Sequence, residues 1–225
     1  MTTKLFGAKV PRVEDQRFLR GQGRYVDDLL HDDPRLLHAA VLRSPHAHAR
    51  ITDIDVSDVL DVDGVVAVWT WEDLTDAMAE PLPLLIPHPT LTHGRTQYAL
   101  AKDEVNYVGE AIAFVVAVDR YVAEDAVSRI RVSYDYLEPV VGIAAARAAD
   151  RLVHDDVPGN IGARMEQENG DARAAIADAP HTLTLELDVE RSACTPMEGR
   201  GTVARWDPDT SRLTVWSTSG SRTTP

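Results

Sequence analysis

The stretch that most constrains the fold is residues 104–138, where two kinds of hydrophobic periodicity follow each other. Residues 111–118 form an unbroken apolar run, which is typical of a strand buried on both faces. Asp119 suits the N-cap of a helix, and the next apolar residues recur at four-residue spacing, as on one helical face: Val122, Ala126 and Ile130. From residue 130 to 136 the period becomes two, which indicates a strand. The sequence therefore predicts a strand–helix–strand unit.

Shorter apolar runs predict strands before this unit, at residues 37–42, 51–56 and 65–69, the last preceded by Gly64 as a turn residue. Residues 4–35 are polar and read as an extended lead-in. Residues 80–98 contain Pro81, Pro83, Pro87 and Pro89, a density that excludes a helix or a central strand. This segment is predicted to be a long surface loop, whether it contacts a partner or is a variable insertion.

The C-terminal third carries a second set of signals. A short helix is predicted from Gly170-Asp171 through Ala177. Apolar residues then alternate with polar ones and predict a half-buried strand: Leu183, Leu185, Leu187 and Val189. Residues 202–206 and 213–217 flank Asp207-Pro208, which favours a type I turn and so a β-hairpin. The sequence alone indicates an α/β or α+β chain.

Composition excludes several classes of function. The net charge of −13 argues against nucleic-acid binding, which needs an excess of Lys and Arg. Cys194 is the single cysteine, so the chain has no internal disulfide and holds no iron–sulfur cluster by itself. A small buried side chain is the favoured interpretation of Cys194 over a reactive thiol. There is no apolar run of the ~20 residues that span a bilayer and no signal-peptide core, so a cytoplasmic protein is expected.

Few residues suggest chemistry by their spacing. His46 and His48 share one side of an extended segment, but no third ligand follows at a metal-site spacing, which favours strand-edge or turn histidines over a metal site. Gly21-Gln22-Gly23 lacks the third glycine of a dinucleotide-binding loop and is predicted to be a turn. The adjacent acidic pairs point to opposite faces of an extended chain, so no general acid–base pair is predicted: Asp27-Asp28, Asp32-Asp33 and Asp155-Asp156.

Several ordered motifs together resemble the molybdopterin-binding large subunit of the xanthine dehydrogenase and aldehyde oxidase family, in the branch that includes the carbon monoxide dehydrogenase large subunit. The resemblance runs from about residue 6 to residue 218. It rests on PRVED (11–15), LRGQGRYVDD (19–28), LRSPHAHARI (42–51), VNYVGE (105–110), AEDA (123–126), VSYDYLEP (132–139) and TPMEGR (195–200).

This resemblance implies an α+β fold in three parts. They are an extended lead-in (1–18), an α/β hammerhead domain (19–142) and the truncated start of a molybdopterin-binding domain (150–225). It also implies an oxidoreductase that hydroxylates an aldehyde, an N-heterocycle or a similar carbon, or oxidises CO, with water as the oxygen source. The complete enzyme would hold molybdenum on a molybdopterin, in the cytosine dinucleotide form. FAD and 2Fe-2S clusters would lie on medium and small partner subunits.

Two departures from the family pattern limit what the chain is expected to do. Relatives are several times longer, and their catalytic glutamate lies beyond residue 225, so no catalytic residue and no metal ligand is assigned and the chain alone is expected to be inactive. Ser219 stands where the family has a glutamine that approaches the molybdenum ligands, and is the one predicted cofactor-contacting residue. Glu198 and Arg200 match a family motif and are interpreted as a structural ion pair.

The abrupt loss of the family pattern after residue 218 leaves several origins open. The chain is expected to be the product of a truncated or frameshifted gene, or a split subunit that associates with a separately encoded remainder. The alternative function is a non-catalytic subunit-interaction domain.

Overall fold

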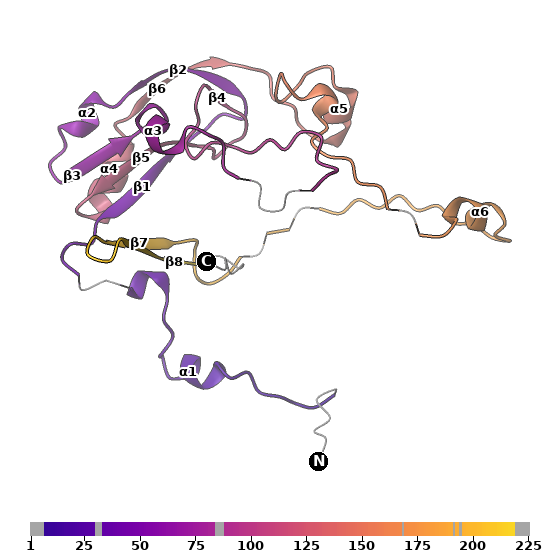
Figure 1. Cartoon of the computed structure of the whole chain (residues 1–225), viewed down its shortest axis with the longest axis horizontal. Helices are drawn as coiled ribbons and strands as arrows, with labels where there is room; N and C mark the ends of the chain where they lie inside the picture. The colour runs from indigo at the N-terminus through magenta and orange to yellow at the C-terminus, as the bar shows by residue number, and fades with distance from the viewer. Residues whose placement is uncertain are drawn as a thin grey trace. The chain divides into compact units, whose positions relative to one another are not determined.

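The computed structural model describes residues 7–29, 33–83, 88–167, 169–190, 192–193 and 195–218. The chain divides into two compact units, of which the larger is Leu37–Leu183 and the smaller combines Met1–Leu36 with Thr184–Pro225 (Figure 1). Ser219 and Cys194 lie outside the described residues, so the expectations for these two side chains stay predictions.

The larger unit contains two three-stranded antiparallel sheets. In the first, β5 (Ala111–Ala117) lies between β1 (His38–Arg43) and β3 (Val65–Trp69). In the second, β2 (Ala49–Asp55) lies between β4 (Glu104–Val105) and β6 (Arg131–Tyr136). The unbroken apolar run thus becomes the central strand of its sheet, as predicted. The strand predictions at 37–42, 51–56, 65–69 and 130–136 are also confirmed.

Helix α4 (Arg120–Val127) follows β5, so the predicted strand–helix–strand unit is confirmed. The carboxylate of Asp119 accepts hydrogen bonds from the backbone N–H groups of Tyr121 (2.8 Å) and Val122 (3.4 Å) and caps the helix. Ala123 and Ala126 bury the apolar face of the helix. The two flanking strands belong to different sheets, so the strand–helix–strand segment connects the two sheets.

The core of the larger unit consists of two buried clusters that share neighbours. One contains Val59, Ala113, Val115, Ala126 and Ile130, and the other contains Ala49, Ala101, Val105 and Ile112. Leu42, Ile54 and Val132 pack against both clusters. Because these three side chains bridge the clusters, the two sheets form one continuous core.

Short helices and turns complete the larger unit. They are α2 (Ser57–Leu60), η2 (Glu72–Leu74), α3 (Thr75–Met78), α5 (Ile143–Ala148), η3 (Pro158–Asn160) and α6 (Ala172–Ala177). Asp171 caps the predicted helix α6 through the backbone N–H of Ala174. The described parts of the proline-rich segment, residues 80–83 and 88–98, contain no helix or strand, which agrees with the predicted loop.

The smaller unit contains α1 (Asp15–Leu19), the 3-10 turn η1 (Val26–Asp28) and the hairpin of β7 (Thr202–Asp207) and β8 (Arg212–Ser217). The hairpin confirms its prediction. The segment predicted to be extended, residues 4–35, is not extended throughout, because α1 forms near its centre. Gly21 ends this helix at φ +65°, where the N–H groups of Gly21 and Gln22 bond to the carbonyls of Phe18 and Arg17. The interpretation of Gly21-Gln22-Gly23 as a turn is therefore confirmed.

The strand predicted at residues 183–189 is wrong for the described structure. No strand forms there, and the side chains of the alternating residues Leu183, Leu185, Leu187 and Val189 are 67–85% exposed. A half-buried strand needs a neighbouring strand and an apolar layer, and the described residues provide neither to this segment. Periodicity alone did not reveal that the partner is lacking.

Within the described parts of the chain, no helix is long and apolar enough to cross a membrane.

Candidate functional site

The position predicted to approach the cofactor directly follows the base of the β7–β8 hairpin. There the backbone N–H of Thr218 donates to the carbonyl of Gly201 (3.1 Å), and the Gly201 N–H donates to the Thr218 hydroxyl (3.0 Å). These bonds continue the register in which Thr202 faces Ser217. The hairpin thus fixes the backbone up to Thr218, and Ser219 is the next residue.

Glu198 connects the hairpin base to η1. Its carboxylate accepts a hydrogen bond from the backbone N–H of Val26 (2.8 Å), across 172 residues of sequence. The Val26 side chain also packs close to Gly201, where an added Cβ would lie 3.2 Å from Cγ1 of Val26. The interpretation of Glu198 and Arg200 as an ion pair is wrong for the described residues, because no ion pair joins them there. The Glu198 carboxylate bonds instead to the N–H of Val26, the first residue of η1.

A polar cluster in the larger unit was not predicted as a site. Nε2 of His48 lies 2.6 Å from Oε1 of Glu104, and its Nδ1 lies 3.2 Å from the carbonyl oxygen of Glu138. Both ring nitrogens of His48 therefore lie within hydrogen-bonding distance of an oxygen atom. In the orientation that satisfies its amide, Asn106 donates to Oε1 of Glu104 (3.1 Å) and to the carbonyl of Val153 (3.0 Å).

Glu110 is a buried carboxyl group beside this cluster, with 6% of its surface exposed. Burial raises its pKa, and the hydrogen bond from the Asn106 N–H (2.6 Å) opposes this effect in part. Glu104 contributes a further, smaller increase by charge repulsion. Glu110 directly precedes β5, so an acidic residue abutting a fully apolar run is the sequence signal that would have found it.

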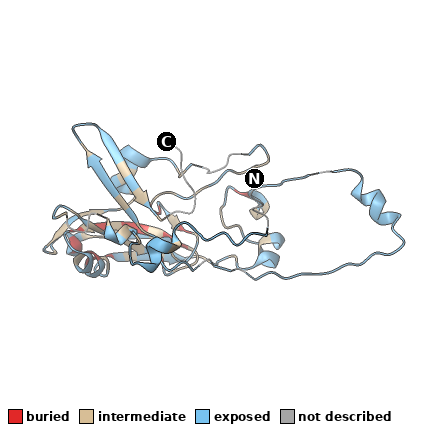
Figure 2. Ribbon diagram, turned by 90° about the horizontal axis from the view of Figure 1, so that it is seen from below, coloured by how far each residue is buried: buried red, intermediate tan, exposed pale blue. Residues whose placement is uncertain are grey.

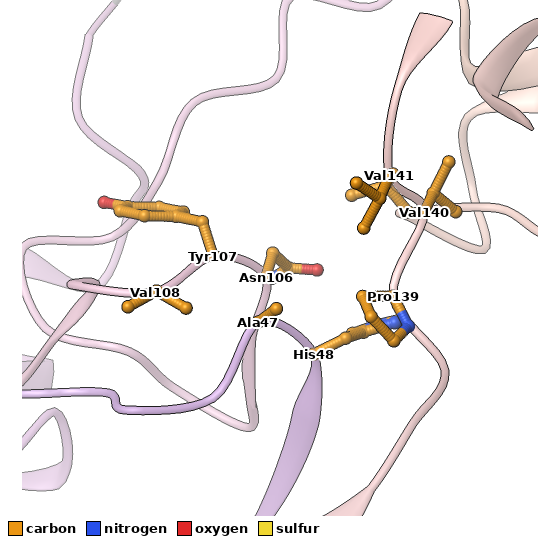
Figure 3. Close-up of a pocket in the computed structure, with 9 residues that line it drawn as sticks. Ala47, His48, Asn106, Tyr107, Val108, Pro139, Val140 and Val141 are labelled. Atoms are coloured by element: carbon orange, nitrogen blue, oxygen red, sulfur yellow. The ribbon is translucent and has the colours of Figure 1, made fainter. Parts of the chain in front are cut away.

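A shallow pocket borders the polar cluster. It has a volume of about 180 Å³ and is lined mainly by apolar side chains of the larger unit. Figure 3 shows Tyr107 and Val108 on one side of it and Pro139 to Val141 on the other, with His48 and Asn106 between them. Typical small-molecule sites have volumes of ~300–1,000 Å³. The pocket is therefore small for a substrate. The cluster itself links β2, β4 and the segment after β6 through the contacts of His48.

The two histidines singled out in the sequence do not converge. His46 packs against the edges of Tyr134 and Tyr136, at centroid distances of 4.7 and 4.8 Å, whereas His48 faces Glu104. This result agrees with strand-edge histidines. Among the residues that the structure describes, no three His, Cys, Asp or Glu side chains are grouped as metal ligands.

The adjacent acidic residues also serve separate purposes. Asp28 accepts a hydrogen bond from the Tyr25 N–H (2.9 Å), and Asp156 forms an ion pair with Arg95 (2.5 Å). Neither carboxylate is directed at a neighbouring carboxylate in these contacts. The geometry therefore offers local structural roles for them.

Comparison with known proteins places these features in a family. The profile of the aldehyde oxidase and xanthine dehydrogenase a/b hammerhead domain matches residues 20–138, and that of the molybdopterin cofactor-binding domain matches residues 153–223. The nicotine 6-hydroxylase large subunit of Paenarthrobacter nicotinovorans is 36% identical over 96% of this chain and 26% of its own length. The carbon monoxide dehydrogenase large chain of Hydrogenophaga pseudoflava is 36% identical over 92% of this chain and 26% of its own.

Solved structures give the same result. Quinoline 2-oxidoreductase from Pseudomonas putida 86 superposes with a TM-score of 0.80 at 35% identity, over 94% of this chain and 26% of that one. The aldehyde oxidoreductase of Desulfovibrio gigas superposes with a TM-score of 0.82 at 28% identity, over 95% and 24%. The chain spans about a quarter of the length of these relatives and matches their N-terminal part. The chain therefore belongs to the aldehyde oxidase and xanthine dehydrogenase family, with a hammerhead domain followed by the start of a molybdopterin-binding domain.

Proposed function

We propose that this chain supplies the N-terminal part of a molybdenum hydroxylase large subunit and works only together with the polypeptide that forms the rest of that subunit. The observation that carries the proposal is the match of more than nine-tenths of this chain to about a quarter of each large subunit. The proposed domain bounds are 1–18 for the lead-in, 19–142 for the hammerhead domain and 150–225 for the start of the molybdopterin-binding domain.

The described residues do not by themselves fit a molybdopterin. The base of the β7–β8 hairpin offers Gly201 and Thr218, but their polar groups already bond to each other. The buried carboxyl of Glu110 belongs to the larger unit and is occupied by the Asn106 N–H. We therefore derive no reaction step from this chain. Ser219 is proposed to border the cofactor at the glutamine position, and the remaining contacts are assigned to the rest of the subunit.

In the proposed complete enzyme, molybdopterin in its cytosine dinucleotide form would supply the molybdenum chemistry for hydroxylating a carbon, or for oxidising CO, with oxygen from water. The candidate substrates are an aldehyde, an N-heterocycle or a similar compound, and CO. Electrons leave through 2Fe-2S clusters and FAD on partner subunits, since the single cysteine of this chain holds no cluster alone. In this arrangement, the present chain forms the hammerhead domain and the first part of the domain that surrounds the cofactor.

The test is to produce this chain together with a polypeptide that supplies the rest of the subunit. A chimera in which this chain replaces the matched N-terminal quarter of the nicotine 6-hydroxylase large subunit, produced with that enzyme's other subunits, meets this need. Metal analysis and pterin fluorescence should then show both molybdenum and pterin, and substrate-dependent dye reduction should be measurable. The unchanged relative is the positive control.

Two results would count against the proposal. A chimera that assembles with the other subunits but contains no molybdenum or pterin would favour the alternative, a non-catalytic subunit-interaction domain. Dye reduction by this chain alone, after reconstitution with molybdenum cofactor, would refute its dependence on the rest of the subunit.

A further inference from the structure

Residues 184–190 form an extended, unpaired segment with one apolar side. Leu185, Leu187 and Val189 alternate along it, and their side chains are 67%, 78% and 85% exposed. No backbone hydrogen bond joins this segment to any other residue that the structure describes. Its seven residues correspond to a strand of roughly 20 Å. A row of large apolar side chains beside unpaired backbone groups is the pattern of a strand without its sheet.

The β7–β8 hairpin of the same unit is also incomplete. Residue pairs Trp206–Leu213 and Ala204–Val215 lie on one face, and the three large side chains of this face are 52–59% exposed. The described sheet has two strands, so each strand has a free edge. Figure 2 shows the hairpin coloured almost entirely as exposed or intermediate. Two-stranded sheets are marginally stable in water unless a further strand or layer covers them.

We propose that residues 184–190 are a docking strand that pairs with a β-strand from the part of the large subunit beyond the segment matched here, and that the same polypeptide covers the apolar face of the hairpin. This inference rests on the proposed function. Three-quarters of the relatives' length lies outside the match, and residues 153–223 match the start of the molybdopterin-binding domain. A large unmatched part of the same subunit is therefore available to supply the pairing strand. Strand addition to a free edge combines backbone bonds with side-chain burial.

A second copy of this chain fits the docking strand less well. The polar side of the strand carries Glu186, Asp188 and Glu190. Antiparallel self-pairing centred on Glu186 would place two Glu186 carboxylates directly opposite each other, and parallel in-register pairing would align all three acidic residues. Like charges opposite each other destabilise a sheet. The charge pattern therefore favours a different strand.

The test is hydrogen exchange, measured by mass spectrometry, on peptides that cover residues 184–190. The exchange rates are compared between this chain alone and the chimera with the rest of the nicotine 6-hydroxylase large subunit. We expect rapid exchange in the chain alone and exchange slowed by about 100-fold or more in the chimera, as for amides in a stable sheet. Peptides from β5 should be protected in both proteins and serve as the internal reference.

A matched pair of variants separates side-chain burial from added charge. Leu187→Asp places a charge on the apolar side of the docking strand, and Thr184→Asp places the same charge on its polar side. Leu187→Asp should abolish the protection in the chimera, whereas Thr184→Asp should retain it. Equal protection in the two variants would overturn the proposal.

The outcomes also separate this inference from the proposed function. A chimera that contains molybdenum and pterin while residues 184–190 exchange rapidly would overturn the docking strand alone. Protection of the segment in a chimera without molybdenum would support the docking strand and contradict the proposed function. Protection in the chain alone, with a dimer seen by light scattering, would identify a second copy as the occupant and overturn the proposal.

Discussion

Ile112 offers a direct test of the core of the larger unit. Its side chain is fully buried on β5, in the cluster with Ala49, Ala101 and Val105. Replacing it with alanine removes three carbon atoms. Two of its neighbours are alanines, whose side chains are too short to move into the space, so the cavity should persist.

The expected loss follows from transfer and cavity costs. Three buried carbons account for about 2.4 kcal/mol at ~0.8 kcal/mol each. The residual cavity adds to this cost, so Ile112→Ala should lower the free energy of unfolding by about 3–4 kcal/mol. Val115→Ala removes two carbons from the other cluster and should cost about 2–3 kcal/mol by the same reasoning.

Urea unfolding followed by far-ultraviolet circular dichroism measures both losses. With a slope of roughly 1–3 kcal/mol per molar urea, the midpoint should fall by about 1–4 M for Ile112→Ala. Val66→Ala on the neighbouring strand β3 is the control, because Val66 is 55% exposed. A loss for Ile112→Ala within about 0.5 kcal/mol of the control would refute the placement of this core. Separate transitions for the Ile112 and Val115 variants would refute the joining of the two clusters.

Three further predictions concern polar groups. Burial raises the pKa of Glu110, so the folded protein binds this proton more tightly, and the free energy of unfolding falls as the pH rises from about 4.5 through the raised pKa. Glu110→Gln keeps an acceptor for Asn106 and should lessen this fall in urea titrations at pH 4 to 8; equal pH dependence in both proteins would contradict the assignment. Glu198→Ala should remove the bond to the Val26 N–H and cost about 1 kcal/mol, or roughly fivefold faster exchange of that amide, while Glu198→Gln should retain protection. Unchanged exchange in Glu198→Ala would refute the connection. In the chimera, Ser219→Gln should raise the molybdenum content relative to Ser219→Ala by about two- to tenfold, the worth of one hydrogen bond; equal contents would remove Ser219 from the cofactor site.

The larger unit could be predicted wherever its structure depends on neighbours in sequence. Residues 111–136 show this, since burial on both faces, the Asp119 cap and the change of period are all local signals. The pairing of His48 with Glu104 could not be predicted, because it joins residues 56 apart whose contact depends on β2 pairing with β4. The division of β5 and β6 between two sheets is likewise set by packing of the whole unit.

The prediction that failed, at residues 183–189, had a periodicity as clear as that of β6. The difference lies in the partner: β6 pairs with β2 of the same unit, whereas residues 184–190 find no strand in the described chain. Alternating apolar residues indicate that a segment packs against a neighbouring strand and an apolar layer, whether or not the same chain supplies them. Under the proposed function, the exposed segment with this pattern is the proposed binding surface for the rest of the subunit. The hairpin shows the same difference between its base and its apolar face. At the base, Glu198 bonds to Val26, whereas no layer of the described residues covers the apolar face.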